Sequence, residues 1–596
     1  MLSRRKLFSM LLMMAVLFLL YMLTWVYRES VNDYDTNEYA TEGSDIHRSD
    51  IRTLPGGEDA KKQRTVYIGE KDSDMGKMVA QWCAYRKRPF ICFSSVKEYM
   101  ARLDADDEIL CIAPECLAEP SDARLLSGLD GRDMVVVFGG LPETKLIKES
   151  PELCKLLGIE EIRSEQTKLS GVYLYEGFLL GGEALYRTDM GEEFGQGLDL
   201  SIPWYKLSDG TKTYMTGLTG TVEEDAGQGE RPSILWRNTT GNTTVFAVNG
   251  DYLNGGIGLG LLEAMMAESH SYLLYPVINA QNLTVVGYPS FASENEKELK
   301  HIYANSHKML LQNIIWPSLV SVSEQSGFRM TCFLTPQLSY LDKTEPETED
   351  LVYYLRQMKE RQGEMGWSAH SKDSVSVKDK WDRDMEFFEE AESSYAYTAA
   401  YASGRETQQC LEVMKAGGMS DIRTLTGIAD EGNALLSFIS EDITYQGITH
   451  RADQYSFLDD LRNRSFQTAL GYTNILLDMG GVTWPETKEE RWENYSRRIS
   501  GNIGTWWKPY SDFDKTTLTE SDSRLRSFLA LGYEDSQEDG VIRLKLKNRR
   551  GTVSFLLRAH DKNVKSVSGG TAAKIEEDIW LLSAAEDEVQ IELSNQ

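Results

Sequence analysis

The stretch from Gly327 to Asp373 constrains the fold of this chain more than any other part of it. It opens with a short apolar run, Gly327–Pro336, which is typical of a buried strand. A helical segment, Thr348–Gln362, follows, and a second strand-like segment, Gly363–Asp373, carries a histidine. A strand, a helix and a second strand in this order form one βαβ step, so the sequence predicts a parallel α/β sheet or barrel here.

The same stretch resembles the NodB-type polysaccharide deacetylases, in which a strand ending T-F-F precedes a helix and the motif E-I-G-x-H-(S/T)-x-x-H. Thr331-Cys332-Phe333 and Glu364-Met365-Gly366 match this frame, and Leu283–Ser290 resembles the first motif of the family, L-T-F-D-D-G-P-S. The resemblance implies a distorted (β/α) barrel over residues 271–515. It also implies metal-dependent deacetylation, in which an aspartate and two histidines hold a divalent metal and a second aspartate acts as the base.

The expected metal ligands are replaced in this sequence. Ser368 and Lys372 stand at the two histidine positions, and Val286 and Gly287 stand at the two aspartate positions. Because a Val or Gly side chain offers no metal-binding atom, we expect no cofactor and a barrel that binds glycan without catalysis.

An active enzyme with relocated ligands remains the alternative. In that case His370 and Asp373 would hold zinc, cobalt or manganese, and Asp478 would join them in catalysis. His450 is a weaker candidate for the same set. A hydrogen-bonded histidine at a strand end is the more common role for a residue such as His370.

Aromatic residues crowd the segment 479–513. Aromatic faces stack on the apolar faces of sugar rings, while polar neighbours hold the hydroxyl groups. The segment therefore predicts a carbohydrate-binding set, with a place in the barrel core as the alternative for the same rings. Its members are Trp484, Trp492, Trp506, Trp507 and Tyr510.

The first residues of the chain predict a membrane anchor. Arg4-Arg5-Lys6 precedes a nearly unbroken apolar run, Leu7–Tyr27, which is close to the ~20 residues that a helix needs to cross a bilayer. Basic residues before the run favour a cytoplasmic N-terminus, and no small-residue cleavage site follows it. We expect a single-pass signal anchor within residues 1–30, an extracytoplasmic remainder, and a flexible acidic stalk over residues 31–64. A cleaved signal peptide is the alternative.

Two further domains are predicted on either side of the barrel. Residues 65–270 alternate short apolar runs with helical segments, as in a flavodoxin-like or glutamine-amidotransferase-like α/β domain, with a β-rich insertion at about residues 169–248. The glycines of residues 256–260 are interpreted as letting a helix pack closely on a strand, and not as a dinucleotide site. Residues 524–596 alternate apolar and polar positions between turns, as in a small antiparallel β-sandwich.

The net charge of −29 argues against nucleic acid as a partner, because phosphates need a basic surface. An acidic ectodomain suits a cationic glycan. The order of the parts, together with residues 274–290, resembles membrane-anchored proteins that accompany Pel-type exopolysaccharide machinery, and the deacetylase-like portion of PelA. This resemblance implies a role in making, modifying or exporting an amino-sugar polysaccharide. A structural partner of polysaccharide synthase subunits in the membrane is a third interpretation.

Overall fold

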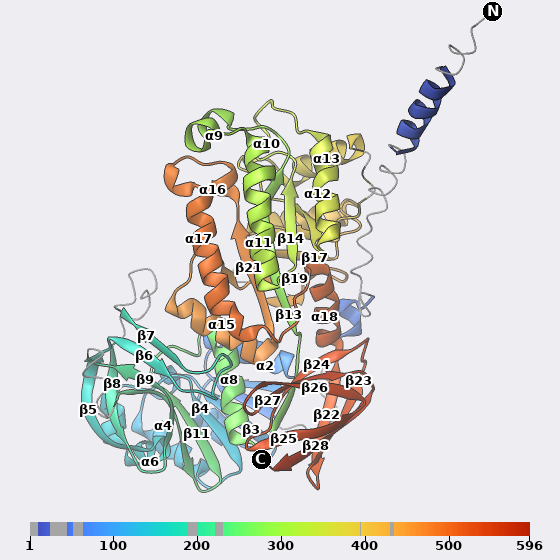
Figure 1. The fold of residues 1–596 in the computed structure, drawn as a ribbon. Helices are drawn as coiled ribbons and strands as arrows, with labels where there is room; N and C mark the ends of the chain where they lie inside the picture. The colour runs from blue at the N-terminus through green and yellow to red at the C-terminus, as the bar shows by residue number, and fades with distance from the viewer. Residues whose placement is uncertain are drawn as a thin grey trace, which may run out of the picture.

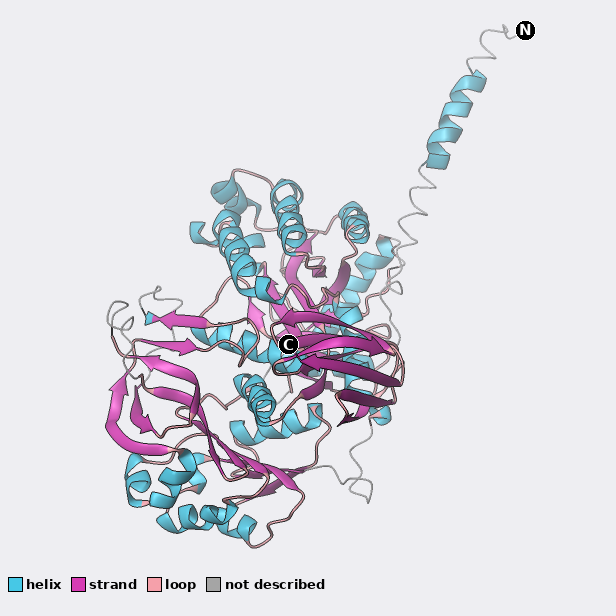
Figure 2. Cartoon of the chain, turned by 60° about the horizontal axis from the view of Figure 1, so that its bottom comes forward, coloured by secondary structure: helices cyan, strands magenta, loops and turns pink. Residues whose placement is uncertain are grey.

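The computed structural model describes residues 10–23, 45–51, 64–188, 201–220, 231–391, 393, 395–428 and 434–595. Figure 1 shows a first α/β part at the lower left, a helix-covered part around a curled sheet at the top, and β-sheets near the C-terminus at the lower right. Figure 2 shows how strands gather in the lower parts while helices surround the upper one. The prediction of a mixed α/β protein with several domains is confirmed.

The first part is built on one nine-stranded sheet. Its parallel half has the order β2-β1-β3-β4-β11, and its antiparallel half continues with β10, β9, β6 and β7. The predicted β-rich segment thus extends the parallel sheet at one edge, and it adds a separate two-stranded ribbon, β5 with β8. The strands are β1 (Arg64–Ile68), β2 (Phe90–Phe93), β3 (Asp107–Ile112), β4 (Met134–Phe138), β5 (Ile159–Lys168), β6 (Gly171–Leu174), β7 (Ala184–Arg187), β8 (Ser201–Leu207), β9 (Lys212–Leu218), β10 (Ser233–Thr240) and β11 (Thr243–Val248).

Helix α8 (Gly256–Ser269) carries the glycines that were expected to pack against a strand, and this expectation is wrong. The glycines face helices: a Cβ added at Gly260 would lie 2.4 Å from the Cα of Ser465 in α15 (Phe457–Leu470). A Cβ at Gly258 would lie 2.6 Å from the Cε of Met78 in α2 (Asp74–Tyr85). The Gly260 amide also donates to the Ser465 hydroxyl at 2.7 Å, so the glycines join the first part to the curled sheet's helices.

The second nine-stranded sheet is curled and almost entirely parallel, in the order β18-β19-β17-β16-β15-β14-β13-β21-β20, with β18 alone antiparallel to its neighbour. Strand β19 lies near one edge of this sheet and β20 lies at the other edge. Only Thr449 separates the two strands in the chain, so a continuous segment joins the two edges. The predicted βαβ step is confirmed, with β14 and β15 as parallel neighbours and α12 (Thr348–Glu360) between them. The strands are β13 (Ala280–Ser290), β14 (Met330–Thr335), β15 (Glu364–Ser368), β16 (Ala399–Tyr401), β17 (Thr424–Ile428), β18 (Leu436–Phe438), β19 (Thr444–Ile448), β20 (His450–Arg451) and β21 (Tyr472–Asp478).

The inside of the curled sheet is polar where the strands start and apolar where they finish. Near the end where the strands finish, which we call the mouth, Val286, Phe333, Tyr401 and Leu476 share an apolar cluster. Toward the opposite end, which we call the amino end, buried amides and hydroxyls bond one another; the Thr284 hydroxyl, for example, donates to Asn474 Oδ1 at 2.7 Å. Because buried polar groups need partners, this network holds the strands in register.

Helix α18 (Leu518–Ala530) closes the amino end of the sheet. The amides of Leu518 and Thr519 donate to Thr331 Oγ1 and Glu364 Oε2, both at 3.0 Å. Further along the helix, Asp522 and Arg526 form a buried ion pair at 2.8 Å. This closing helix was not predicted, because its residues are largely polar.

The C-terminal part is a sandwich of two four-stranded antiparallel sheets, as predicted. One has the order β22-β23-β28-β25, and the other has the order β12-β24-β27-β26. Strand β12 (Leu273–Val277) comes from the start of the segment assigned to the barrel and pairs with β24. In the chain, the first strand of the sandwich therefore precedes the curled sheet, and the other seven strands follow it. The other strands are β22 (Gly532–Glu538), β23 (Val541–Lys547), β24 (Val553–Arg558), β25 (Lys562–Ser568), β26 (Gly570–Glu576), β27 (Ile579–Ala584) and β28 (Glu588–Asn595).

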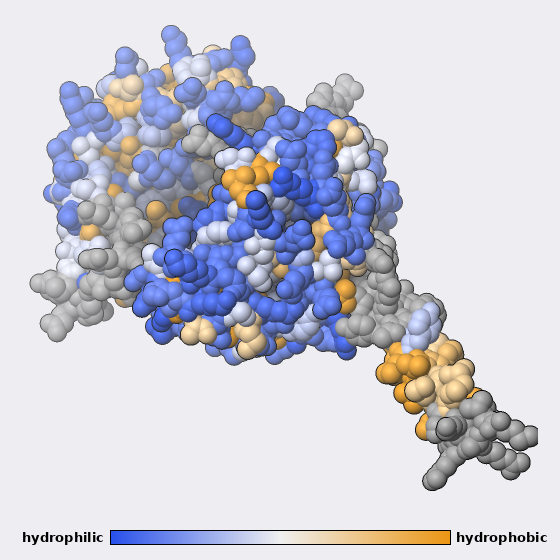
Figure 3. All heavy atoms as spheres, turned by 90° about the horizontal axis from the view of Figure 1, so that it is seen from above, coloured by the Kyte–Doolittle hydropathy of each residue, from blue (hydrophilic) through white to orange (hydrophobic). Residues whose placement is uncertain are grey.

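The predicted anchor, residues 7–27, lies partly outside the described residues. Its described portion is a helix over residues 10–23 with exposed apolar side chains, which Figure 3 shows protruding from the body. Within the described parts of the chain, no helix reaches the length and apolar character of a membrane span.

The predicted stalk, residues 31–64, is also mostly outside the described residues, but its central piece is not. Residues 45–51 lie against α18 and the turn between β18 and β19, with Ile46 buried there. The expectation of a flexible stalk is therefore wrong for this piece.

Candidate site at the mouth of the curled sheet

The mouth gathers charged side chains from the ends of several strands. His370 follows β15, and its Nδ1 lies 3.2 Å from Glu406 Oε1 in the first turn of α14 (Arg405–Lys415). The amide of Ser403 donates to the other oxygen of Glu406 at 3.2 Å, which fixes this carboxylate. The hydrogen bond with Glu406 raises the pKa of His370, and the nearby charge of Asp478 adds to this effect. The ring of His370 can therefore carry a proton while 60 % of its side chain is exposed.

Asp478 ends β21 on the other side of the mouth. Its Oδ2 lies 3.6 Å from Arg451 Nη1 of β20, and its Oδ1 accepts a hydrogen bond from the Gly480 amide at 3.1 Å. Arg451 is also held by Asp453 at 3.1 Å. Burial raises the pKa of the Tyr401 hydroxyl, and the negative charges of Asp478 and Glu406 raise it further. Tyr401 therefore lies neutral at the base of the site.

Lys372 and Trp484 form a second group at the rim. The Lys372 ammonium lies 3.0 Å from Glu486 Oε1 and 4.7 Å from the centre of the Trp484 ring. A cation over an indole face is favourable, and both side chains remain partly accessible. An indole face next to charged hydrogen-bonding groups is the combination that suits a sugar ring.

Asp373, which was predicted to act with His370, is used elsewhere. Its Oδ2 accepts hydrogen bonds from the Ser339 hydroxyl at 2.8 Å and from the Leu341 amide at 3.0 Å. These bonds fix the loop after β14 and leave Asp373 out of the pairing between His370 and Glu406. The proposed ligand pair of His370 and Asp373 is therefore not supported by the geometry.

Glu294 lies buried under the same loop. Its two carboxylate oxygens accept hydrogen bonds from the amides of Leu338 and Ser339, at 2.7 and 2.9 Å. Burial raises the pKa of Glu294 to about 7, the two amides oppose the rise, and the charges of Asp342 and Asp373 add to it. The loop thus rests on a carboxyl group that changes charge near neutral pH.

The positions that hold a metal in the NodB-type family do not fit one here. Val286 is buried in the apolar cluster, Gly287 has a left-handed backbone with φ of 72°, and Ser368 is buried. Lys372 places an ammonium group, and not a ligand, at the fourth position. Within the described residues, no group of three or more His, Cys, Asp or Glu side chains could hold a metal ion.

Burial decides the roles of most of the predicted aromatic set. Trp492, Trp507 and Tyr510 are only 2–3 % exposed, so their rings have no face left for a sugar, and the prediction is wrong for these three. Trp506 is partly buried and stacks on Tyr455 with ring centres 4.7 Å apart. Trp484 is the member that lies at the mouth.

His450 is part of the core and not of the site. Its two ring nitrogens contact Thr449 Oγ1 at 2.9 Å and the Asp459 carbonyl at 3.0 Å. Burial lowers the pKa of His450 to about 3, so the ring stays neutral.

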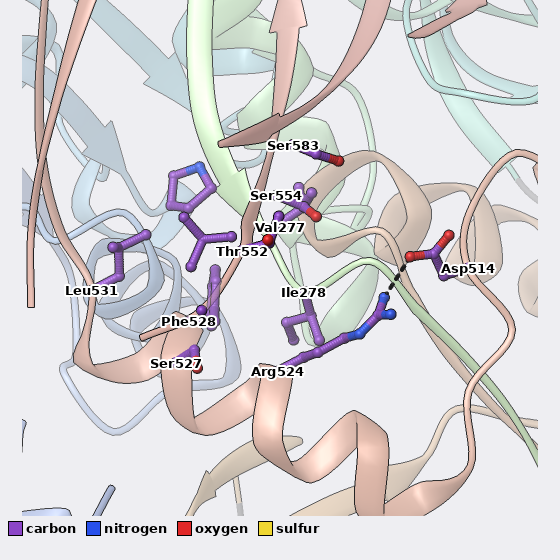
Figure 4. Close-up of a pocket in the computed structure, with 13 residues that line it drawn as sticks. Val277, Ile278, Asp514, Arg524, Ser527, Phe528, Leu531, Thr552, Ser554 and Ser583 are labelled. Atoms are coloured by element: carbon purple, nitrogen blue, oxygen red, sulfur yellow. Dashed lines mark hydrogen bonds and ion pairs between the residues drawn. The ribbon is translucent and has the colours of Figure 1, made fainter. Parts of the chain in front are cut away.

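Two of the cavities among the described residues lie at opposite ends of the curled sheet. One, of about 530 Å³, adjoins the mouth and is lined by Ile428, Ile448 and Arg451 together with residues of α8 and α15. Arg451 lies in both this cavity and the charged group of the mouth. The other, of about 260 Å³, lies at the amino end between α18 and the sandwich, where Asp514 pairs with Arg524 at 2.8 Å (Figure 4). Its only cation is thus neutralised among the residues that line it, and we place the candidate site at the mouth.

Sequence reasoning missed Glu406, Arg451 and Glu486, which complete the site. Glu406 follows β16, Arg451 ends β20 and Glu486 follows β21, and single-sequence patterns do not tell which strand ends meet. The position of Glu406 in the first turn of a helix after a short strand was the one available signal, because loops at the carboxyl ends of parallel strands commonly carry sites.

Comparisons with known proteins add little to this geometry. No protein-family model matches the sequence, and no curated protein matches it. Among solved structures, a β-galactosidase from Bacillus circulans sp. alkalophilus is 12 % identical, with 36 % of this chain and 34 % of that chain covered and a TM-score of 0.22. A putative ThuA-like protein from Bacteroides uniformis is 10 % identical, with 36 % of this chain and 95 % of that chain covered and a TM-score of 0.24.

An α-amylase from Anoxybacillus is 11 % identical, with 47 % of this chain and 73 % of that chain covered and a TM-score of 0.17. The chain spans about a third of the length of the β-galactosidase. With TM-scores this far below 0.5, these likenesses carry no argument about the fold or the chemistry of the chain.

Proposed function

We propose that this protein is a membrane-anchored, extracytoplasmic protein that binds an amino-sugar exopolysaccharide at the mouth of the curled sheet. Its role would lie in making, modifying or exporting a Pel-like polymer on a catalytically degenerate deacetylase fold. The anchor is the apolar run of residues 7–27, and the polymer meets Trp484 and the charged groups around His370. Synthase subunits in the membrane are the partners that such a role would require.

The position of Lys372 carries this proposal. The resemblance to the NodB-type family puts a metal-binding histidine at this position, and the ammonium found there is paired with Glu486 over Trp484. A fixed positive charge opposes a divalent cation, while the neighbouring indole remains a surface on which a sugar can stack. The exposed carboxylate of Glu486 and the half-buried carboxylates of Glu406 and Asp478 favour a glycan with free amino groups.

Binding to a partly de-acetylated hexosamine polymer tests the proposal directly. We expect Trp484→Ala to weaken binding by about tenfold, which corresponds to about 1.4 kcal/mol for one lost stacking partner. Trp580→Ala is the matched control, because Trp580 is also partly buried under a lysine, with Lys574 Nζ 5.7 Å from its ring centre, but lies in the sandwich. Equal binding by Trp484→Ala and wild type would exclude the mouth as the glycan site.

A metal-dependent deacetylase with relocated ligands is the second candidate. One observation favours it: Glu406 engages Nδ1 of His370, so Nε2 is the ring nitrogen that a metal would use, with the charge of Asp478 nearby. Acetate release from N-acetylated hexosamine polymers in the presence of zinc, cobalt or manganese tests this candidate. Release that is lost in His370→Ala would establish it and would overturn a purely binding role.

A further inference from the structure

The segment before the first folded part makes specific contacts with the body of the protein. Residues 45–51, which we call the docked segment, lie next to α18 and the turn between β18 and β19 (Figure 1). Ile46 is 3 % exposed and packs with Phe438 and Ala530. Ile51 of the same segment is partly buried and packs against this cluster.

Main-chain and side-chain bonds fix the direction of the docked segment. The Arg48 amide donates to the Glu441 carbonyl at 2.9 Å, and the Ser49 amide donates to Glu441 Oε1 at 3.0 Å. The His47 ring lies 2.6 Å from Asp442 Oδ1. These partners lie in the turn between β18 and β19, so the segment is aligned along this turn.

The carbonyl of Ile46 also completes the bonding of a buried cation. Arg526 is 1 % exposed, and its Nη1 donates to the Ile46 carbonyl at 2.7 Å. Its other bonds go to Asp522 and to the carbonyls of Arg423 and Asp442, at 2.7–2.8 Å. Most partners of Arg526 therefore stay in place without the docked segment, and the body can remain folded when the segment leaves.

We propose that the docked segment is a releasable latch that sets the distance between the N-terminal apolar run and the body. When it is docked, residues 28–44 alone connect the two, and they reach at most about 60 Å at ~3.4 Å per residue. When it is released, residues 28–63 connect them and reach at most about 120 Å. The contacts are few and the segment lies at the surface, which are the properties of a region that opens at low free-energy cost.

The docked segment and the surface that it contacts belong to the same chain. Only residues 52–63 separate this segment from Arg64, the first residue of β1, so the segment and the body are close together along one chain. The latch stands on the contacts alone, whereas its effect on reach rests on the proposed membrane anchor.

Trypsin cleavage after Arg48 in the full-length protein in detergent tests the latch. Ile46→Asn removes the buried side chain, and we expect cleavage after Arg48 to become at least about tenfold faster than in the wild type. His47→Ala, which removes an exposed side-chain hydrogen bond to Asp442, should give a smaller increase of about two- to threefold. Asp45→Asn is the matched control, because Asp45 is exposed in the same segment, and its cleavage rate should equal that of the wild type.

The outcomes separate the latch from the anchor. The cleavage rate of each protein is divided by that of a synthetic peptide of residues 43–53, which cannot dock. Equal ratios for the wild type and Ile46→Asn would overturn the latch. Protection that rises with protein concentration would overturn docking within one chain and would indicate exchange of the segment between copies. Neutron reflectometry on a supported bilayer measures reach, and Ile46→Asn should give a thicker protein layer. If Ile46→Asn is cleaved faster but its protein layer has the same thickness as that of the wild type, the effect on reach is overturned. If the wild-type protein does not insert into the bilayer, the anchor itself is overturned.

Discussion

The two ends of the curled sheet place their charges in opposite environments. At the mouth, the pairs His370–Glu406 and Lys372–Glu486 are partly exposed, so water screens them and each contributes little to stability. At the amino end, Asp522 and Arg526 are almost fully buried, where an unpaired charge is costly. The comparison teaches that one end of the sheet is available for ligands, while the other is committed to holding the fold.

Removal of Arg526 should have the largest effect on stability. Arg526→Met would leave Asp522 and the carbonyls of Ile46, Arg423 and Asp442 without their donor. We expect the free energy of unfolding to fall by about 3–5 kcal/mol, as when one partner of a buried pair is removed. Urea denaturation measures this quantity.

The matched control for this substitution is Arg356→Met. Arg356 also pairs with an acid four residues away in a helix, Glu360, but both side chains are about half exposed. Its loss should lower the unfolding free energy by no more than about 0.5 kcal/mol. A similar loss in both variants would remove the distinction between buried and exposed pairs.

Glu294, a buried carboxyl group near the mouth, should have the second-largest effect on the free energy of unfolding. Its pKa of about 7 in the folded protein is above the usual value of about 4.3 in an unfolded chain. The stability that comes from its protonated form is therefore fully present below about pH 4.3 and is lost as the pH rises through about 7. The difference between these two pKa values corresponds to about 3.7 kcal/mol over this window.

Glu294→Gln should remove this dependence. We expect the unfolding free energy of the variant to change less between about pH 4 and pH 7 than that of the wild type. Glu349→Gln is the control, because Glu349 is exposed at the start of α12 and its loss should leave the pH dependence as it is. Parallel pH curves for wild type and Glu294→Gln would show that Glu294 does not titrate in this range.

Lys372→Met should have a small effect on stability. The pair with Glu486 is exposed, so its loss should change the unfolding free energy by at most about 1 kcal/mol. Thermal unfolding measures the change. A loss as large as that for Arg526→Met would mean that the mouth also holds the fold.

The mildest substitution acts on the pKa of His370 alone. Because the bond with Glu406 is the main cause of the raised pKa, Glu406→Gln should lower it, with no measurable change in stability. An NMR titration of the His370 ring measures this pKa. Glu412→Gln, on the same helix but bonded to Gln408, should leave the pKa of His370 where it is.

Local patterns predicted the elements that depend on nearby residues. The apolar runs of β14 and β15, with a helix between them, predicted the parallel step because burial on both faces of a strand leaves a continuous apolar run. Strand β23 of the sandwich alternates apolar and polar residues because only one of its faces is buried, and this alternation predicted it.

The remaining features depend on contacts between distant parts of the chain. Asp522 and Arg526 stand four residues apart in a polar helix, a spacing that also suits an exposed pair, and only the plugged sheet shows that they are buried. Trp484, Trp492 and Trp507 are the same residue type, and only the burial of Trp492 and Trp507 shows that these two belong to the core. Glu406 and Arg451 meet the site because separate strands end at the same edge.

The pairing of β12 with β24 has a consequence for the order in which the protein can fold. Residues 273–277 are synthesised long before residues 553–558, and the whole curled sheet lies between them in the chain. Until the last strands appear, β12 is an unpaired edge, and such edges invite association with other chains. The C-terminal strands thus act as a late closing step, and a chain that ends before β24 would leave that edge open.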